Sequence, residues 1–141
     1  MEYRRFSDTF VMRLDPGEEV IASIGALCER EGIKLGRVSG IGAVNEATMG
    51  YFDTNTKQYY SRDYAGIYEI ANLSGNISTH DGKPYLHIHA VLAGEGGTAF
   101  GGHLSRAVVS ATCEVFIRVL DGQVGRSFSE EIGLNVMRFP G

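Results

Sequence analysis

Leu86-His87-Ile88-His89-Ala90-Val91-Leu92 is the stretch from which the fold and a functional site can both be predicted, and the glycine-rich segment 94–103 follows it closely. The apolar residues around the histidines favour a β-strand that is buried on at least one face. In an extended strand alternate side chains share a face, so His87 and His89 point the same way with Cα atoms about 7 Å apart. Two imidazoles at this spacing can bind one metal ion, and His103 can supply a third ligand from the next segment.

Three protein ligands would leave one coordination position open, which is typical of catalytic or ligand-binding metal sites, because structural zinc sites are usually closed by four ligands. The alternative interpretation is that the imidazoles are hydrogen-bonded inside the core, since a lone His-x-His pair occurs by chance in many strands. Unpaired imidazoles in so apolar a strand would carry a desolvation cost. His103 adds weight to the metal interpretation, and both interpretations stay open at this point.

Length and composition fit one globular domain over residues 1–141, with 43% hydrophobic residues available for a core. The formal net charge is −4, and the 13 lysines and arginines are scattered along the chain. The sequence shows no basic patch, so we expect only weak attraction to the phosphates of a nucleic acid.

The two cysteines, Cys28 and Cys113, have no paired spacing and are expected to be small buried apolar residues. No segment approaches the roughly 20 apolar residues of a membrane span. The N-terminus also lacks the apolar core of a secretion signal. These features predict a cytoplasmic protein with no membrane partner.

A strand is expected over 9–14, and the pattern Asp15-Pro16-Gly17-Glu18 after it is typical of a helix start. Asp15 suits the N-cap, Pro16 the first helical position and Glu18 the third. Apolar residues then recur with helical spacing until Gly32, which suits the C-terminal cap. The sequence therefore predicts a helix over 17–31.

The rest of the chain has the composition of strands and tight turns. Three glycines within the first of these strands, Gly36, Gly40 and Gly42, mark bulges or places where another backbone comes close. We expect strands over 34–44, 46–53, 57–64, 67–79, 104–110, 112–120, 123–128 and 134–139, with a short helical turn as an alternative within 104–109.

The turn over 80–84 would fold the 67–79 strand back onto the histidine strand. Asn76, with either Ser74 or Ser78, would then lie opposite the two histidines, which would face a polar surface. His80 lies in the turn itself, so we expect it to be solvated rather than to be a ligand.

Glu114 is an acidic residue in an otherwise apolar run, and it shares a strand face with Phe116 and Arg118. Burying a carboxylate there is costly unless the group is paired. Glu114 could orient a ligating imidazole, act as a general base, or simply pair with an arginine. Segment 94–99 also satisfies the outline of a dinucleotide-binding loop, but no helix follows it, so we discard that motif.

Three pairs of segments stand out together, namely 40–44 with 47–52, 66–70 with 73–78, and 84–89 with 100–104, and the later strand with Glu114 and Val115 fits the same pattern. In this combination the chain resembles the plant and prokaryote conserved (PPC) domain family over essentially its whole length.

This resemblance implies an α+β fold with a mainly antiparallel β-sheet core and flanking helices, assembled as a homotrimer. It also implies a metal site, most plausibly zinc, at His87, His89 and His103. Plant relatives carry AT-hooks and regulate transcription, and stand-alone prokaryotic members are often labelled DNA-binding proteins. This chain has no Arg-Gly-Arg-Pro hook, and Ile67 stands where plant members usually carry arginine, so the DNA-binding label transfers poorly.

Three functions compete at this stage. The first is a metal-binding trimeric domain with a regulatory or scaffolding role, whose direct binding to DNA is weak. The second is a small zinc enzyme with Glu114 or Glu69 as general base. The third is a sensor in which the metal binds a small carboxylate or a similar ligand. One guess is that such a ligand lies between protomers near residues 40–45.

Overall fold

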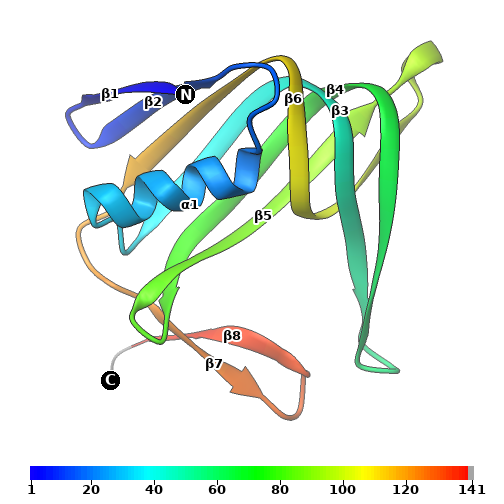
Figure 1. Cartoon of the computed structure of the whole chain (residues 1–141). Coiled ribbons are helices and arrows are strands. Elements are labelled where there is room, and N and C mark those ends of the chain that lie inside the picture. The colour runs from blue at the N-terminus through cyan, green and yellow to red at the C-terminus, as the bar shows by residue number, and fades with distance from the viewer. Residues whose placement is uncertain (140–141) are drawn as a thin grey trace.

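The computed structural model describes residues 1–139, which form a predominantly antiparallel β-sheet with an α-helix packed against it (Figure 1). In chain order the elements are β1 (Glu2–Phe6), β2 (Thr9–Leu14), α1 (Val20–Glu31), β3 (Gly36–Asp53), β4 (Gln58–His80), β5 (Lys83–Ala93), the 3-10 turn η1 (Glu95–Gly97), β6 (Ala99–Val119), β7 (Gly125–Ser129) and β8 (Leu134–Arg138). The mainly antiparallel sheet is confirmed, but within the described chain one α-helix takes the place of several flanking helices.

The strands pair in the order β1-β2-β6-β3-β4-β7-β8, and β5 pairs with both β4 and β6. Strands β3, β4, β5 and β6 therefore form a closed circuit of pairings. Strand β6 makes this possible, because it pairs with β5 at its beginning and with β2 and β3 further along. The register of β3 and β4 shifts between Gly40 and Gly42, where the glycines predicted a bulge.

Several predicted strands are continuous in the structure. Segments 34–44 and 46–53 belong to β3, segments 57–64 and 67–79 to β4, and segments 104–110 and 112–120 to β6, with no helical turn in 104–109. A β-bulge shifts the alternation of inward and outward side chains by one residue, so it looks like a strand end in the sequence pattern.

Helix α1 begins at Val20, three residues later than the sequence predicted. Gly17 has a φ angle of +86°, a left-handed conformation that cannot belong to the helix. Glu19 is the N-cap in place of Asp15, and its carboxylate accepts hydrogen bonds from two amides of the first turn. Gly32 ends the helix with a φ angle of 65°, as its position predicted.

The core lies between α1 and the inner face of the sheet. The helix contributes its predicted apolar stripe, and the strands contribute alternate residues such as Leu73, Ile77 and Ile88. Cys28 and Cys113 are both free and fully buried, and burial raises the pKa of Cys28 to about 12 and that of Cys113 to about 11. Their expected role as small apolar core residues is confirmed.

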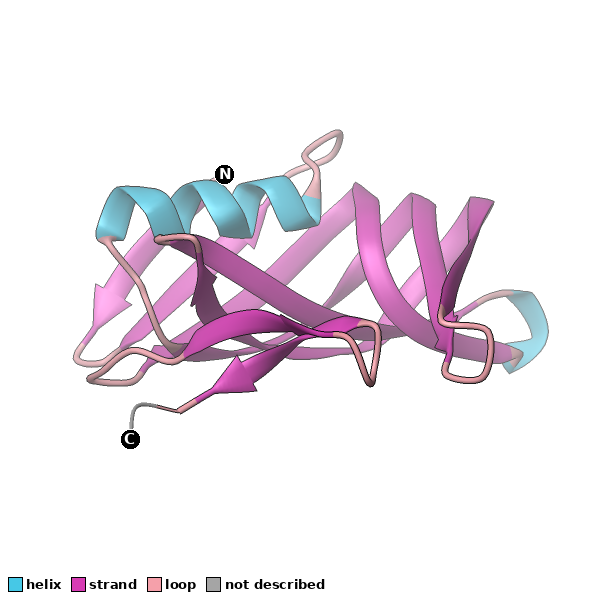
Figure 2. Cartoon of the chain, turned by 90° about the horizontal axis from the view of Figure 1, so that it is seen from below, coloured by secondary structure: helices cyan, strands magenta, loops and turns pink. Residues whose placement is uncertain are grey.

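The hairpin formed by β7 and β8 lies on the side of the sheet opposite to α1 (Figure 2). It is joined to β4 by one parallel bridge between Thr79 and Gly125, and the amide of Thr79 donates to the carbonyl oxygen of Val124 at 3.0 Å. The hairpin therefore lies next to the outer face of β4 and β5, which is the face opposite α1. Among residues 1–139 no helix has the length and apolar character needed to cross a membrane.

Candidate metal centre

His87 and His89 lie on the outer face of β5, away from α1, while Ile88 between them is buried in the core. The register of β4 and β5 places Asn76 opposite His87 and Ser74 opposite His89. The pairing predicted from the hairpin is therefore confirmed, and the two imidazoles share a face with polar side chains of β4.

His103 reaches the same place from β6. It pairs with His89 of β5 on one side and with Gly50 of β3 on the other. A Cβ atom at Gly102 would lie 2.6 Å from the carbonyl oxygen of Gly50, so the two strands approach this closely only because residue 102 is glycine. On the other side, a Cβ atom at Gly101 would lie 2.9 Å from the carbonyl oxygen of Ala90, so adjacent glycines bring β6 close to both β3 and the histidine strand β5.

The three imidazoles converge. One nitrogen from each of His87, His89 and His103 lies within 4.8 Å of the others, and the ring centroids are 5.0 to 5.6 Å apart. In a tetrahedral zinc site with Zn–N bonds near 2.0 Å the ligand nitrogens are about 3.3 Å apart, so small rotations of the rings would reach ligating geometry. The donor set therefore fits a divalent ion such as zinc.

His80 provides an internal comparison. Its Nδ1 lies 3.1 Å from the carbonyl oxygen of Arg126 and its side chain is 34% exposed, so this ring, which the sequence predicted to be solvated, is hydrogen-bonded to the backbone. Within the described residues the rings of His87, His89 and His103 have no such partner. The alternative of three histidines hydrogen-bonded inside the core does not fit these rings.

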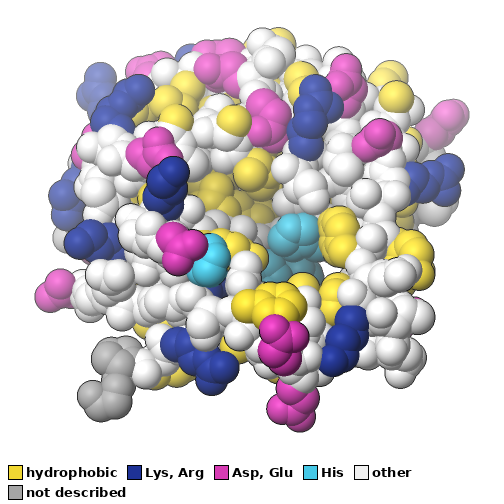
Figure 3. Space-filling view, turned by 60° about the horizontal axis from the view of Figure 1, so that its bottom comes forward, with side chains coloured by type: hydrophobic (Ala, Val, Ile, Leu, Met, Phe, Trp, Pro, Cys, Tyr) yellow, Lys and Arg dark blue, Asp and Glu magenta, His cyan; other side chains and the backbone are white. Residues whose placement is uncertain are grey.

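The histidines open into a cavity of about 420 Å³, a size within the range of small-molecule sites. Figure 3 shows histidine side chains in a hollow with hydrophobic side chains around it. No acidic residue belongs to the part of the lining that the structure describes. The cavity is lined by Gly50, Tyr51, Phe52, Tyr59, Tyr85, His87, His89, Gly102, His103, Arg126, Leu134 and Asn135.

Arg126 of β7 is fixed beside the histidines by three hydrogen bonds. Its Nε donates to Ser78 Oγ at 2.7 Å, one terminal nitrogen donates to Asn76 Oδ1 at 3.0 Å, and the other donates to the carbonyl oxygen of Asn135 at 2.9 Å. Its guanidinium also lies over the ring of Tyr85, 4.7 Å from the centroid. A positive charge is therefore held in place at the wall of the cavity.

Both burial and neighbouring charge favour neutral imidazoles. The pKa of His87 falls to about 4 because the ring is desolvated, and His89, Arg126 and His103 add like-charge repulsion when protonated. Desolvation, with a smaller contribution from His89, also lowers the pKa of His103. Because only the neutral imidazole binds metal, these two candidate ligands are in the protonation state that binding requires at neutral pH.

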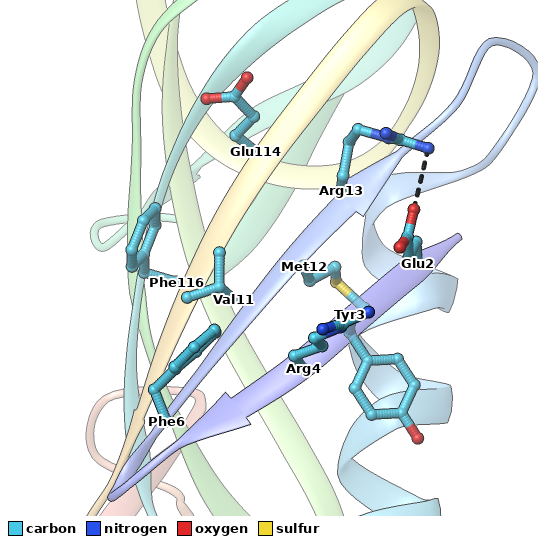
Figure 4. A pocket seen from close by; sticks show the side chains of 9 residues that line it. All are labelled: Glu2, Tyr3, Arg4, Phe6, Val11, Met12, Arg13, Glu114 and Phe116. Carbon is cyan, nitrogen blue, oxygen red and sulfur yellow. Dashed lines mark ion pairs between the residues drawn. The ribbon is translucent and has the colours of Figure 1, made fainter.

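The two glutamates proposed as general bases lie elsewhere. Glu114 lines a separate groove on β1, β2 and β6, where Figure 4 shows it beyond Phe116 and Val11. Glu69 is exposed on β4, opposite Ala93 of β5, and does not line the histidine cavity. The lining of this cavity therefore gives no support to either glutamate as a base.

Sequence reasoning missed Arg126 and the aromatic wall. Arg126 lies in the predicted 123–128 strand, but nothing in that segment indicates that it would reach Asn76, fifty residues away in the sequence. Tyr59 packs edge-on against His103, with ring centroids 5.8 Å apart, and its hydroxyl lies 3.2 Å from Ser105 Oγ. The nearest sequence signal was the density of tyrosines around 51–60.

The fold and the site together define a small β-rich domain with a three-histidine candidate metal centre on the outer face of its sheet. The chain belongs to the Plants and Prokaryotes Conserved (PCC) domain family, whose model matches residues 1–121. This is the family abbreviated PPC above, so the resemblance is confirmed. A search of the curated proteins found no match to the chain.

Three solved structures are similar over nearly their whole length. A "putative DNA binding protein" from Bacteroides thetaiotaomicron has a TM-score of 0.95 at 29% identity, covering 98% of this chain and 96% of that one. A "metal-containing protein" from Archaeoglobus fulgidus has a TM-score of 0.89 at 39% identity, covering 98% and 97%. A PPC protein from Pyrococcus horikoshii has a TM-score of 0.86 at 32% identity, covering 99% and 95%.

The lowered pKa of His87 predicts a pH-dependent stability of the metal-free protein. In the unfolded chain this imidazole binds a proton near pH 6.5, whereas in the folded chain it does so only near pH 4. The unfolded state therefore binds more protons between these values, so the free energy of unfolding falls as the pH is lowered from about 6.5 toward about 4.

Urea unfolding in the presence of a chelator, at pH 7 and pH 5, measures this effect. His87→Gln lacks the titrating ring, so we expect its unfolding midpoint to fall less between these pH values than that of the unchanged protein. Equal losses in both proteins would contradict the assignment.

Proposed function

We propose that this protein is a trimeric, zinc-binding PCC domain with a regulatory role, whose direct binding to DNA is weak. The observation that carries the proposal is the convergence of His87, His89 and His103 within 4.8 Å at the wall of a cavity. The similar protein from Archaeoglobus fulgidus is described as metal-containing, which supports a metal at the corresponding place in this chain.

Zinc is the ion that this donor set favours, because three imidazole nitrogens suit its tetrahedral geometry and no oxygen ligand belongs to the group. A zinc ion held by three neutral imidazoles keeps its full charge and acts as a Lewis acid toward a fourth ligand. Tyr59 packs edge-on against the ring of His103, and the pairing of β4 with β5 places His87 and His89 on one face. The backbone thus brings the three candidate ligands close together before any ion binds.

Removing one imidazole tests the proposed metal site. We expect His89→Ala to lower the zinc affinity by about 100-fold or more. Substituting a residue that only hydrogen-bonds to a metal ligand already lowers metal affinity by about 10- to 100-fold, and His89 would be a ligand itself. Isothermal titration of the metal-free protein with zinc measures the affinity, and metal analysis of the purified protein identifies the ion.

His80→Ala is the matched control, since it removes the fourth histidine without touching the cluster, and its zinc affinity should stay within a few-fold of the unchanged protein. A stoichiometry far from one ion per chain, or equal losses in the two variants, would count against the site.

The proposed trimer needs a contact surface, and the outer face of β1, β2, β6 and β3 supplies a candidate. Phe6, Ile41 and Phe116 are 61%, 57% and 48% exposed there. Figure 4 shows Phe6 and Phe116 beside Val11 in a groove bordered by the ion pair of Glu2 and Arg13. Large apolar side chains gathered on one face are typical of protein interfaces.

Placing a charge in this groove should dissociate the trimer. We expect the protein to sediment at three times the 15.3 kDa chain mass, and Phe116→Glu to sediment at the mass of one chain. Phe128→Glu, which changes a 55% exposed phenylalanine on β7, should leave the trimer intact. Monomeric unchanged protein would refute the trimer, and a trimeric Phe116→Glu variant would refute this interface.

Weak DNA binding is proposed on charge. The chain has 17 acidic against 13 basic residues. Some of the basic side chains are already paired with carboxylates, as Arg106 is with Glu46 at 2.8 Å and Arg118 is with Asp8 at 3.1 Å. With Arg13, three of the 13 basic side chains are paired in this way, so the proposal rests mainly on the net charge of −4, which repels phosphates. The "putative DNA binding" description of similar proteins keeps the question open to experiment.

Measuring the DNA affinity at several salt concentrations tests whether the protein binds DNA only weakly. Each phosphate contact adds about −0.9 to the slope of log K against log salt, so we expect a slope no steeper than about −2 and a Kd above about 1 μM at physiological salt. Fluorescence anisotropy with a labelled duplex and the zinc-loaded protein measures both. Nanomolar affinity for a preferred sequence would overturn this part of the proposal.

A second candidate function is the binding of a small molecule at the open metal position, either as a ligand or as a substrate. The cavity of about 420 Å³ beside the histidines favours it. For an enzyme, the catalytic base would have to reach this cavity, and neither Glu114 nor Glu69 lines it. Ligand binding therefore needs fewer additional assumptions than catalysis.

A further inference from the structure

The histidine cavity is electropositive in a protein whose net charge is −4. Arg126 contributes one positive charge to its wall, and no carboxylate belongs to the described lining. A divalent ion on three neutral imidazoles would add two more positive charges that nothing in this lining balances. The cavity would therefore attract an anion out of water.

Arg126 has hydrogen-bonding capacity left for such an anion. A guanidinium has five N–H donors, and three of them are engaged by Ser78, Asn76 and the carbonyl oxygen of Asn135. Two N–H groups, one on each terminal nitrogen, have no partner among the described residues. The three bonds and the ring of Tyr85 fix the plane of the group, so it loses little freedom when an anion binds.

The rest of the wall is aromatic and apolar. Tyr51, Tyr59 and Leu134 line the cavity, yet they remain 64%, 43% and 41% exposed. A ligand with an apolar or aromatic body would cover this surface and gain the hydrophobic free energy of doing so. A small hydrated dianion such as inorganic phosphate would leave it uncovered.

We infer that this cavity binds a small monocarboxylate with an aromatic or apolar body, whose carboxylate is recognised by Arg126 and by the charge of the metal. The inference rests on the proposed function for the metal and adds the class of ligand. Arg126 is a binding residue in this account, and the tyrosines form the subsite for the body of the ligand. The competing explanation is that Arg126 only fastens the β7–β8 hairpin to β4.

Benzoate is the probe, acetate is the anion without a ring, and benzamide is the ring without a charge. Isothermal titration of the zinc-loaded protein should give an affinity for benzoate at least about tenfold higher than for acetate or benzamide, since each lacks one of the two interactions. Arg126→Gln should lower the benzoate affinity by about tenfold or more and leave that of benzamide unchanged.

The zinc affinity of Arg126→Gln separates recognition from folding. Removing a positive charge near the ligands should leave the zinc affinity equal or higher, whereas a displaced hairpin would lower both affinities. Arg138→Gln is the matched control, because Arg138 lies in the same hairpin, donates to Ser127 at 2.8 Å and does not line the cavity. If Arg126→Gln does not fold, Arg126→Lys replaces it; it keeps the charge but lacks the two free N–H groups of the guanidinium, so it should lower the benzoate affinity several-fold and leave that of benzamide unchanged.

The outcomes separate the two proposals. Zinc binding without a preference for benzoate, or with a benzoate affinity that Arg126→Gln does not change, would overturn the inference and leave the metal site standing. If zinc does not bind, the proposed function fails, and titration of the metal-free protein with benzoate decides the rest. Binding that depends on Arg126 would then support the anion subsite, and no binding would overturn it.

Discussion

The double pairing of β6 at His103 is the constraint on which the site depends. At this residue β6 lies between β5 and β3, with His89 on one side and Gly50 on the other. Without this crossover the third imidazole would lie on a different part of the sheet from the His87 and His89 pair. The same crossover closes the circuit of pairings through β3, β4, β5 and β6, so the geometry of the site and the stability of the sheet have one origin.

The site combines neutral imidazoles with a fixed positive charge beside them. Desolvation and the neighbouring guanidinium of Arg126 lower the pKa of His87, which keeps this candidate ligand neutral, while three hydrogen bonds and a tyrosine ring hold the guanidinium itself. A cation at this position would repel a metal ion bound to the histidines and so lower the affinity of the site for the metal. An anion that binds beside both would offset this cost, so an arginine at this wall favours an anionic ligand over a neutral one.

The parts of the site that depend on local alternation were predictable from the sequence. His87 and His89 had to share a face, and the short turn after β4 had to place Asn76 opposite them. The helix start was not predictable, because the pattern at Asp15 is also compatible with a turn that Gly17 completes in a left-handed conformation. Arg126 could not be found, because its contacts join residues about fifty positions apart and leave no periodic signal.

The three histidines and one side of the cavity wall come from different parts of the chain. The family model matches residues 1–121, which include all three candidate metal ligands, whereas Arg126, Leu134 and Asn135 follow that range. The hairpin that carries them is joined to β4 by one bridge and a few side-chain bonds, so its sequence is weakly constrained by the core. A substitution in the hairpin could therefore change the chemistry of the cavity wall without changing the three histidines.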